Sequence, residues 1–347
     1  RSRPTVPFLC TGQGAQYRGM ARGLYEHQPV FKEALDNCAK VLDPLLEAPL
    51  LNFIFTDDPA DERINQTGNT QPALFALEYA MDKLLAANGI RPDVVMGHSV
   101  GEFAAAVIAG VMSLEDGAKL IAARGRLMQS LPEGGGMLSV FADEADVLPA
   151  LKGFEKTIAV AGLNAEGQTV ISGDVQDLAT IKAALAEADI KAKELKVSHA
   201  FHSPLMIPIL EDFKAVASEI TFSAPQIALI SNLDGKVMQA APDADYWVNH
   251  IRQAVRFKAG VDTALSMGTT VFVEIGPNPT LTGLVKRIAG DTVVLAAPLK
   301  RKRDHQEQWR KAISTLVATG ADTPSTALQP EVTLPNYPFD NKRYWFR

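Results

Sequence analysis

The segment Gly97-His98-Ser99-Val100-Gly101 decides how the chain is interpreted, because it joins a reactive side chain to a recognisable turn. An apolar run at 93–96 precedes it and predicts a buried strand, and an Ala-rich run at 101–109 predicts a helix. A serine between two glycines at a strand–turn–helix junction is typical of a nucleophile elbow. Its hydroxyl would lie at the helix N-terminus, where the helix dipole favours developing negative charge. The alternative is a serine that only caps the helix.

A serine nucleophile needs a base, and two histidines lie close together in a second segment. The stretch Ser198-His199-Ala200-Phe201-His202-Ser203-Pro204 comes where the chain leaves one predicted unit and returns to another, a place where clefts open. From spacing alone, either His199 or His202 could be the base. No Asp or Glu stands out as a third triad member. The other histidines are expected to be packed and hydrogen-bonded (His98), solvated (His27, His305) or at a surface or boundary (His250).

Composition describes an average soluble chain and excludes several classes of protein. The 347 residues are 47% hydrophobic and 21% charged, and this length suggests about two domains. The formal net charge of −6 argues against a protein that binds nucleic acid through phosphates. Two cysteines exclude a disulfide scaffold and a Cys-rich zinc site, and no metal is expected. The most apolar run, at 103–114, is too short to span a bilayer, so no membrane association is expected.

The order of predicted elements divides the chain into a large α/β unit with an insertion. Residues 1–131 and 199–297 alternate apolar strand-like runs with helical patterns. Residues 132–198 show the order strand, helix, strand, strand, helix, strand, which is the ferredoxin-like pattern. Residues 298–347 form a tail with one helical pattern. The chain opens without Met, and we expect it to be a piece of a longer protein.

Motifs distributed along the whole chain resemble, in the same order, the acyltransferase domains of modular type I polyketide synthases, which are relatives of malonyl-CoA:acyl carrier protein transacylases. The segments that carry the resemblance are Gly12-Gln13-Gly14-Ala15-Gln16, Gly97-His98-Ser99-Val100-Gly101-Glu102, Arg124-Gly125-Arg126-Leu127-Met128-Gln129, His199-Ala200-Phe201-His202-Ser203-Pro204-Leu205-Met206, Tyr246-Trp247-Val248-Asn249-His250, Val255-Arg256-Phe257 and Glu274-Ile275-Gly276-Pro277. The resemblance implies an α/β-hydrolase-like large subdomain with an inserted ferredoxin-like small subdomain.

The resemblance also implies a role for each residue that matches a family motif. Ser99 would be the nucleophile that becomes acylated, and His202 the base that takes its proton and returns it to the leaving thiolate. Backbone N–H groups of Gln13 and Val100 would form the oxyanion hole. Arg124 would hold the free carboxylate of a malonyl group, because a guanidinium pairs bidentately with a carboxylate.

Three further residues are weaker candidates. The family orients its histidine through a main-chain carbonyl, and the carbonyl near Arg256 is the candidate here. Gln71 and Asn164 are possible pocket residues, although each could equally cap a helix or a turn.

The tetrad His199-Ala200-Phe201-His202 bears on the choice of acyl unit. In this family it accompanies malonyl, whereas methylmalonyl-selective members carry Tyr-Ala-Ser-His. A phenyl ring at 201 leaves less room than a serine for a branching methyl, and Val100 also fits the malonyl type. One methyl is worth only about 1–3 kcal/mol in a pocket, so we expect a preference for malonyl rather than strict exclusion.

The expected reaction is ping-pong transfer of malonyl from the thioester of coenzyme A to the phosphopantetheine thiol of an acyl carrier protein, without a cofactor. A thioester hydrolase on the same elbow and a non-catalytic docking module are the alternatives. The expected location is the cytoplasm.

The carboxyl end resembles the linker that follows the acyltransferase and packs towards the ketosynthase and linker domains of a parent synthase. Its segments are Leu334-Pro335-Asn336-Tyr337-Pro338-Phe339 and Arg343-Tyr344-Trp345. The run Lys300-Arg301-Lys302-Arg303 could meet an acidic carrier protein or coenzyme A phosphates, and a merely solvated charge run is an equal alternative.

Overall fold

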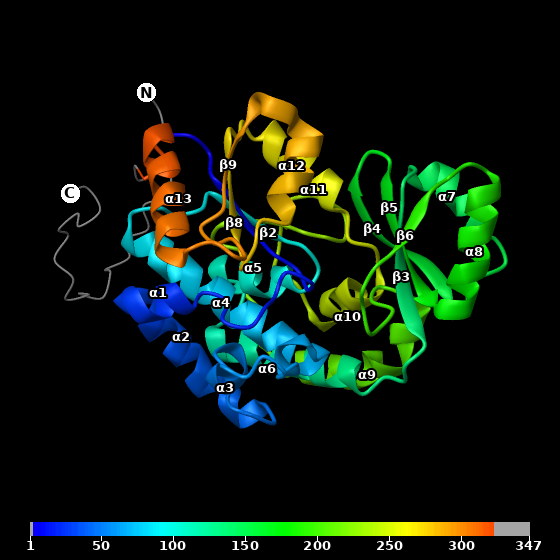
Figure 1. The fold of residues 1–347 in the computed structure, drawn as a ribbon, viewed down its shortest axis with the longest axis horizontal. Helices are drawn as coiled ribbons and strands as arrows, with labels where there is room; N and C mark the ends of the chain where they lie inside the picture. Colours follow the sequence, from blue (N-terminus) through cyan, green and yellow to red (C-terminus); the bar gives the residue numbers. More distant parts are fainter. Residues whose placement is uncertain (1–2, 323–347) are drawn as a thin grey trace.

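A computed structural model describes residues 3–322, and its centre is a five-stranded parallel sheet (Figure 1). The strand order is β7-β2-β1-β8-β9, and every pair in it is parallel. The strands are β1 (Pro7–Cys10), β2 (Val94–Gly97), β7 (Ala228–Ile230), β8 (Val271–Ile275) and β9 (Val294–Ala296). All residues of β1, β2 and β8 are buried, as expected for a parallel sheet covered on both faces.

Helices cover both faces of this sheet. Alternate strand residues point to opposite sides of it and therefore pack into different apolar clusters. Phe8 and Val95 belong to one apolar cluster, while Leu9 and Val94 belong to a second one. The helices of the large unit are α1 (Arg22–His27), α2 (Pro29–Leu42), α3 (Leu50–Ile54), α4 (Thr67–Ala87), α5 (Gly101–Ile108), α6 (Leu114–Gln129), α9 (Leu210–Ala217), α10 (Ala244–Arg252), α11 (Phe257–Ser266), α12 (Leu281–Ala289) and α13 (His305–Thr319). Short 3₁₀ turns are η1 (Asp43–Leu45), η2 (Arg63–Asn65), η3 (Pro204–Ile209) and η4 (Gly290–Thr292).

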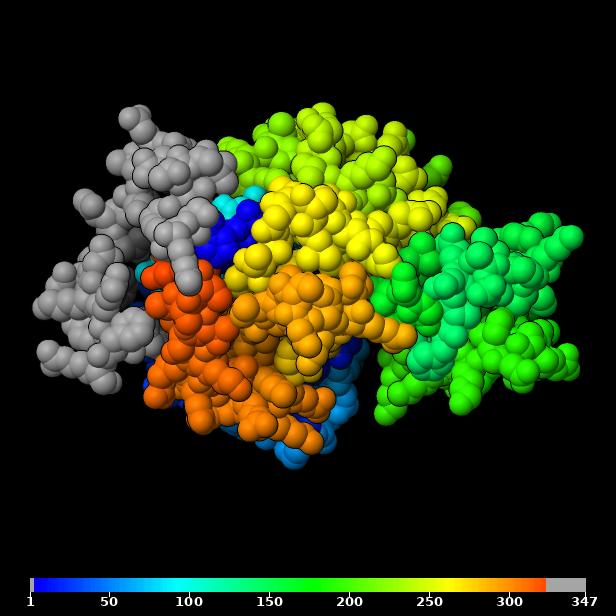
Figure 2. All heavy atoms as spheres, turned by 90° about the horizontal axis from the view of Figure 1, so that it is seen from above, coloured from blue at the N-terminus to red at the C-terminus, as the bar shows by residue number. Residues whose placement is uncertain are grey.

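The inserted unit has an antiparallel sheet of its own, in the order β4-β5-β3-β6. Its elements are β3 (Gly135–Val140), α7 (Glu144–Leu151), β4 (Ile158–Ala165), β5 (Gln168–Asp174), α8 (Val175–Glu187) and β6 (Ala192–Glu194). Leu138 and Ile171 of the sheet share an apolar cluster with Val147 of α7 and Ile181 of α8. The α/β fold class with a ferredoxin-like insertion is therefore confirmed. Figure 2 shows this insertion as a separate lobe at one end of the molecule.

The two sheets are joined by hydrogen bonds as well as by the chain. After α10, Val255 N–H donates to Ala161 O at 2.9 Å, and Leu163 N–H donates to Val255 O at 2.9 Å. Val255 therefore forms a parallel bridge with Gly162 of β4, which ties the insertion to the large unit.

The described part of the expected tail is a helix that belongs to the core of the large unit. Trp309, Ile313 and Leu316 of α13 are buried in the same apolar cluster as Phe8 of β1. The segments at 334–339 and 343–345, which were expected to form the linker, lie outside the described residues. Within residues 3–322, no helix has the length and apolarity needed to cross a membrane.

Candidate active site

Ser99 lies on a sharp turn between β2 and α5, in a backbone conformation that is unusual for a serine. Its φ is +54°, in the left-handed region that costs a non-glycine residue about 1–2 kcal/mol. Both flanking glycines are required. A Cβ on Gly97 would lie 2.1 Å from the backbone nitrogen of Glu102, and a Cβ on Gly101 would lie 2.1 Å from the carbonyl oxygen of Cys10. This is the strand–turn–helix geometry of a nucleophile elbow.

His202 is the histidine that the fold places against Ser99. Its Nε2 lies 2.6 Å from Ser99 Oγ, and the residue is buried at the start of a turn, with φ +58°. Burial, and next the positive charge of Arg124, lower the pKa of His202 from its ordinary value to about 3. The imidazole is therefore neutral near pH 7 and can accept the serine proton.

A main-chain carbonyl near Arg256 was expected to orient the His202 ring. Within the described chain, Nδ1 of His202 makes no hydrogen bond of normal geometry. The backbone groups that raise the pKa of this ring belong to Gln253 and His250. Arg256 itself has an exposed side chain, and its N–H donates to Asn232 O at 2.9 Å, so the expected orienting carbonyl near Arg256 stays a prediction.

Arg124 of α6 points at the same serine. Its Nη2 donates to Ser99 Oγ at 3.4 Å, and its guanidinium lies 5.4 Å from the centre of the Phe103 ring. The residue is 1% exposed, and among the described residues it has no acidic partner and its Nε makes no hydrogen bond. Burial lowers the pKa of this guanidinium to about 9, so it is charged at neutral pH. An unpaired buried cation is costly, which suits a site that receives an anion.

The two expected oxyanion-hole residues lie on neighbouring loops. The loop after β1 approaches the elbow so closely that a Cβ on Gly12 would lie 2.6 Å from His98 O. In the described chain, neither the Gln13 nor the Val100 N–H donates a hydrogen bond, which leaves both free for a substrate oxygen. Gln71 of α4 is buried, and its Nε2 donates to Gln13 Oε1 at 3.3 Å, so it holds the Gln13 side chain.

A cleft of about 770 Å³ lies between the two units. The sequence-predicted residues that line it are Gln13, Ser99, Val100, Arg124, Asn164, Phe201 and His202. Asn164 comes from β4 of the insertion, and its Oδ1 is 2.8 Å from His98 Nε2 across the cleft. Gln71, His199, Ala200 and Arg256 do not line it.

Half of the tetrad faces the cleft, and half supports it. Phe201 is 8% exposed and lines the cleft beside His202. The His199 ring packs 6.1 Å from the Phe201 ring, and its Nδ1 is 3.1 Å from Ser198 Oγ. Ala200 packs against Gly135 at the base of β3.

A buried polar group beneath the elbow was missed by the sequence analysis. Asn232, which follows β7, accepts from the Ser99 N–H through Oδ1 at 2.8 Å and donates to Gly97 O through Nδ2 at 2.8 Å. Its own N–H donates to Glu102 Oε1 at 2.7 Å. His250 is buried 3.5 Å from Glu102 Oε2, so its expected surface or boundary position is wrong. No local pattern marks Asn232, which lies in a turn two residues after the short strand β7.

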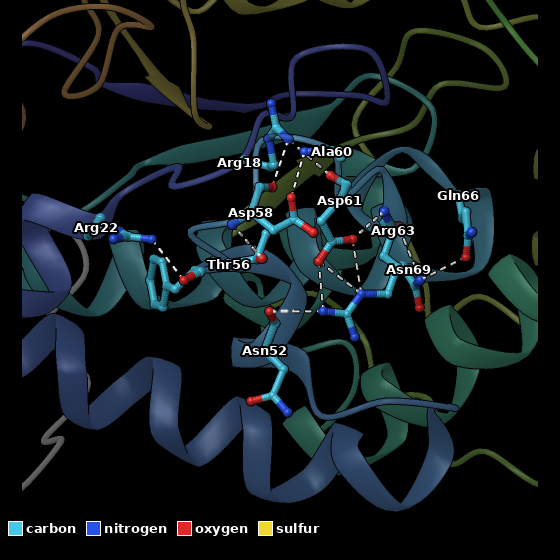
Figure 3. Close-up of polar contacts among 11 residues, drawn as sticks. Arg18, Arg22, Asn52, Thr56, Asp58, Ala60, Asp61, Arg63, Gln66 and Asn69 are labelled. Atoms are coloured by element: carbon cyan, nitrogen blue, oxygen red, sulfur yellow. Dashed lines mark hydrogen bonds and ion pairs between the residues drawn. The ribbon is translucent and has the colours of Figure 1, made fainter.

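The mouth of the cleft is formed partly by a loop before α4, whose internal polar contacts Figure 3 shows. Arg18 donates to Asp58 O at 2.9 Å, and Arg63 pairs with both carboxylate oxygens of Asp61, which fixes the loop. Glu62 and Asn65 of this segment line the cleft.

That loop is connected by hydrogen bonds to the loop after β1 that carries Gln13. Gln16 Nε2 donates to Asn65 Oδ1 at 3.2 Å, and Gln16 Oε1 accepts from the Gly14 N–H at 2.7 Å. Contacts with the loop at the mouth of the cleft therefore restrain Gly14, the residue next to Gln13.

Comparison with known proteins identifies the family. A family model described as acyl transferase domain matches residues 7–323. The chain belongs to this family. A polyketide synthase relative is the phenolphthiocerol synthesis polyketide synthase type I Pks15/1 of Mycobacterium marinum, 41% identical over 343 residues. That match covers 96% of the chain and 16% of the synthase, so the acyltransferase domain spans a small part of that relative.

Solved structures agree with this assignment. The acyltransferase domain from the second module of the salinomycin polyketide synthase superposes with a TM-score of 0.87 at 42% identity, covering 97% of this chain and 80% of that one. A malonyl CoA-acyl carrier protein transacylase from Clostridium perfringens gives a TM-score of 0.82 at 26% identity, covering 91% and 98%. The α/β fold is thus shared with both. Within residues 3–322, no group of three or more His, Cys, Asp or Glu side chains is placed to hold a metal ion.

Proposed function

We propose that this acyltransferase domain takes a malonyl unit from malonyl-CoA onto Ser99 and passes it to the phosphopantetheine thiol of an acyl carrier protein. The observation that carries the proposal is the buried Arg124 guanidinium beside the Ser99–His202 pair, since Nη2 lies 3.4 Å from the serine oxygen and lacks an acidic partner in the described chain. A free carboxylate on the acyl group supplies that partner.

In the first half-reaction, Ser99 Oγ attacks the thioester carbonyl while His202 Nε2, 2.6 Å away, takes the hydroxyl proton. The carbonyl oxygen becomes negative and accepts hydrogen bonds from the Gln13 and Val100 N–H groups. When the intermediate collapses, the C–S bond breaks, and the proton on His202 goes to the departing coenzyme A sulfur. The product is the malonyl ester of Ser99.

In the second half-reaction, the phosphopantetheine thiol of the carrier protein enters by the same route. His202 Nε2 takes the thiol proton, the sulfur attacks the ester carbonyl, and the Ser99 oxygen leaves and regains the proton. Arg124 holds the malonyl carboxylate throughout, so the ester carbonyl stays directed at the oxyanion hole for the incoming thiol.

Two cations at the mouth support a carrier with an anionic arm. Lys196 from the insertion and Arg301 from the large unit both line the cleft. Arg301 is held in place, because its N–H donates to Asn278 Oδ1 at 3.0 Å and its guanidinium lies 5.6 Å from the Tyr17 ring centre. These charges suit the phosphates of coenzyme A and of phosphopantetheine. The other proposed partners are the ketosynthase and linker domains of a parent synthase.

The Phe201 ring in the cleft supports malonyl over branched units. It occupies space beside the reactive serine, and it is backed by the His199 ring, so it cannot simply turn away from an added methyl group. We therefore expect the preference to be moderate, at about 1–3 kcal/mol.

The test is to incubate the domain with malonyl-CoA and locate the mass increase by peptide mass spectrometry, and then to add carrier protein. We expect a malonyl ester on Ser99 that moves to the carrier thiol. Ser99→Ala should abolish labelling, whereas Ser130→Ala, which removes an exposed serine, should not. Free malonate without carrier loading would favour a hydrolase, and the absence of any acyl-enzyme would favour a docking module.

A further inference from the structure

The side chain of Asn232 spans the two peptide groups that lead into Ser99. Its Oδ1 accepts from the Ser99 N–H at 2.8 Å, and its Nδ2 donates to the Gly97 carbonyl at 2.8 Å. Asn232 is 2% exposed and lies beneath the elbow rather than in the cleft, and it does not line the cleft. One planar amide therefore fixes two successive peptide planes.

Asn232 is itself held from both ends of its backbone. Its N–H donates to Glu102 Oε1 at 2.7 Å, and its C=O accepts from the Arg256 N–H at 2.9 Å. Glu102 in turn donates its backbone N–H to Ser99 O at 3.0 Å, and its Oε2 accepts from the Tyr246 hydroxyl. The contacts form a closed ring from Ser99 to Asn232 to Glu102 and back to Ser99.

The elbow needs such a restraint because the backbone conformation at its centre is one that a serine does not favour. Ser99 has a φ of +54°, which a serine in a free chain rarely adopts. If the turn relaxed, Oγ would leave its 2.6 Å contact with His202 Nε2, and the Val100 N–H, one residue later, would turn with it. Both the nucleophile and one oxyanion donor thus depend on the same two peptide planes.

We propose that Asn232 is a positioning residue for Ser99, whose amide holds the elbow so that the serine oxygen and the Val100 N–H address the same carbonyl. Asn232 acts through the backbone and touches neither the acyl group nor the leaving group. The malonyl-CoA arm of the test rests on the proposed function, whereas the inference itself concerns any reaction of Ser99 with an electrophile.

The experiment compares Asn232→Ala and Asn232→Asp with the wild-type domain. Asn232→Ala removes both hydrogen bonds, while Asn232→Asp keeps an acceptor for the Ser99 N–H. Asn88→Asp, at the end of α4, makes the same chemical change where the amide only donates to Leu84 O, and serves as the control. Each protein is assayed for the single-turnover rate of acylation by malonyl-CoA and for labelling by a small fluorophosphonate, with rates normalised to the folded fraction measured by circular dichroism.

We expect Asn232→Ala to slow acylation about 100-fold, as a displaced reacting atom does, while KM for malonyl-CoA changes less than about threefold. Fluorophosphonate labelling should slow in parallel, because it requires Ser99 and His202 but not Arg124. Asn232→Asp should slow acylation at least about tenfold, and Asn88→Asp should be acylated at the wild-type rate. A residue that only stabilised the fold would lower the folded fraction without changing the normalised rate.

Acylation of folded Asn232→Ala within about threefold of the wild-type rate, or a loss confined to KM, would overturn the inference. If Asn232→Ala does not fold, the same criteria apply to Asn232→Asp. A wild-type domain that reacts with the fluorophosphonate but not with malonyl-CoA contradicts the proposed function alone, and the role of Asn232 is then decided by the fluorophosphonate rates.

Discussion

If the site is malonyl-selective as proposed, replacing Arg124 by Ala should leave it hardly able to distinguish malonyl from acetyl. The guanidinium is 1% exposed, and within the described chain it has no acidic partner, so a bound malonate carboxylate would form a buried, charge-assisted pair with it. Removing one partner of a buried pair costs about 3–5 kcal/mol, because the other charge stays buried and unpaired. At 1.36 kcal/mol for each factor of ten, kcat/KM for malonyl-CoA should fall roughly 150- to 5,000-fold.

Acetyl-CoA has no carboxylate, so its reaction in the variant should be unchanged or faster. The wild-type site presents acetyl with an unsatisfied buried cation, whose removal takes away a cost rather than a contact. The decisive quantity is therefore the ratio of kcat/KM for malonyl-CoA to that for acetyl-CoA, measured on the same preparation by release of free coenzyme A. Arg126→Ala is the matched control, because Arg126 lies on the same helix with an exposed side chain.

The Arg124→Ala variant has three possible outcomes, each of which assigns a different role to Arg124. A fall in the malonyl-to-acetyl ratio of 100-fold or more, with Arg126→Ala unchanged, supports a carboxylate contact. An equal loss for both substrates would show that Arg124 supports the geometry of Ser99, which its 3.4 Å contact with Oγ also permits. An unaltered ratio with full activity would refute the assignment of Arg124 as the carboxylate ligand.

Two other predictions concern the tetrad and the base. In competition assays, Phe201→Ser should raise the ratio of methylmalonyl to malonyl use roughly 10- to 200-fold. His199→Tyr alone should raise this ratio less, because Phe201 lines the cleft and His199 does not. An equal effect of the two substitutions would contradict this prediction. His202 has a pKa of about 3, lowered by burial, so it stays neutral from pH 5 to 8, and acylation rates should show no fall over that range as pH decreases. A loss of activity with a midpoint near pH 6.5 would show that the ring titrates normally.

The fold could be predicted from the sequence because its elements carry local signals. In the insertion, the order strand, helix, strand, strand, helix, strand follows from short apolar runs and Ala-rich helical spacing, and the structure has the same order at 135–194. The elbow was equally local, since Gly97 and Gly101 are required by contacts within a few residues or with the adjacent strand.

The residues that hold the elbow and the base could not be predicted, because their contacts are long-range. Asn232 is hydrogen-bonded to Ser99 across 133 positions of sequence, and it lies in a turn two residues after the three-residue strand β7, with no distinctive local pattern. His250 looked like a boundary residue in an amphipathic helix, yet α10 places it against Glu102 in the interior. The backbone groups that raise the pKa of His202 belong to Gln253 and His250, about 50 residues away, and nothing local to either residue indicates this.

Two kinds of unfavourable feature lie close together at this site: backbone strain and a buried charge. Ser99 and His202 both have positive φ values, and Arg124 is a buried cation without an acidic partner in the described chain. Such features persist only where the surroundings over-determine them. Asn232, in the turn after the edge strand β7, provides this restraint for the serine through its two hydrogen bonds. No side chain of the described residues does so for the charge of Arg124. We therefore expect the substrate to neutralise this charge, so that an anionic acyl group gains most from entering this cleft.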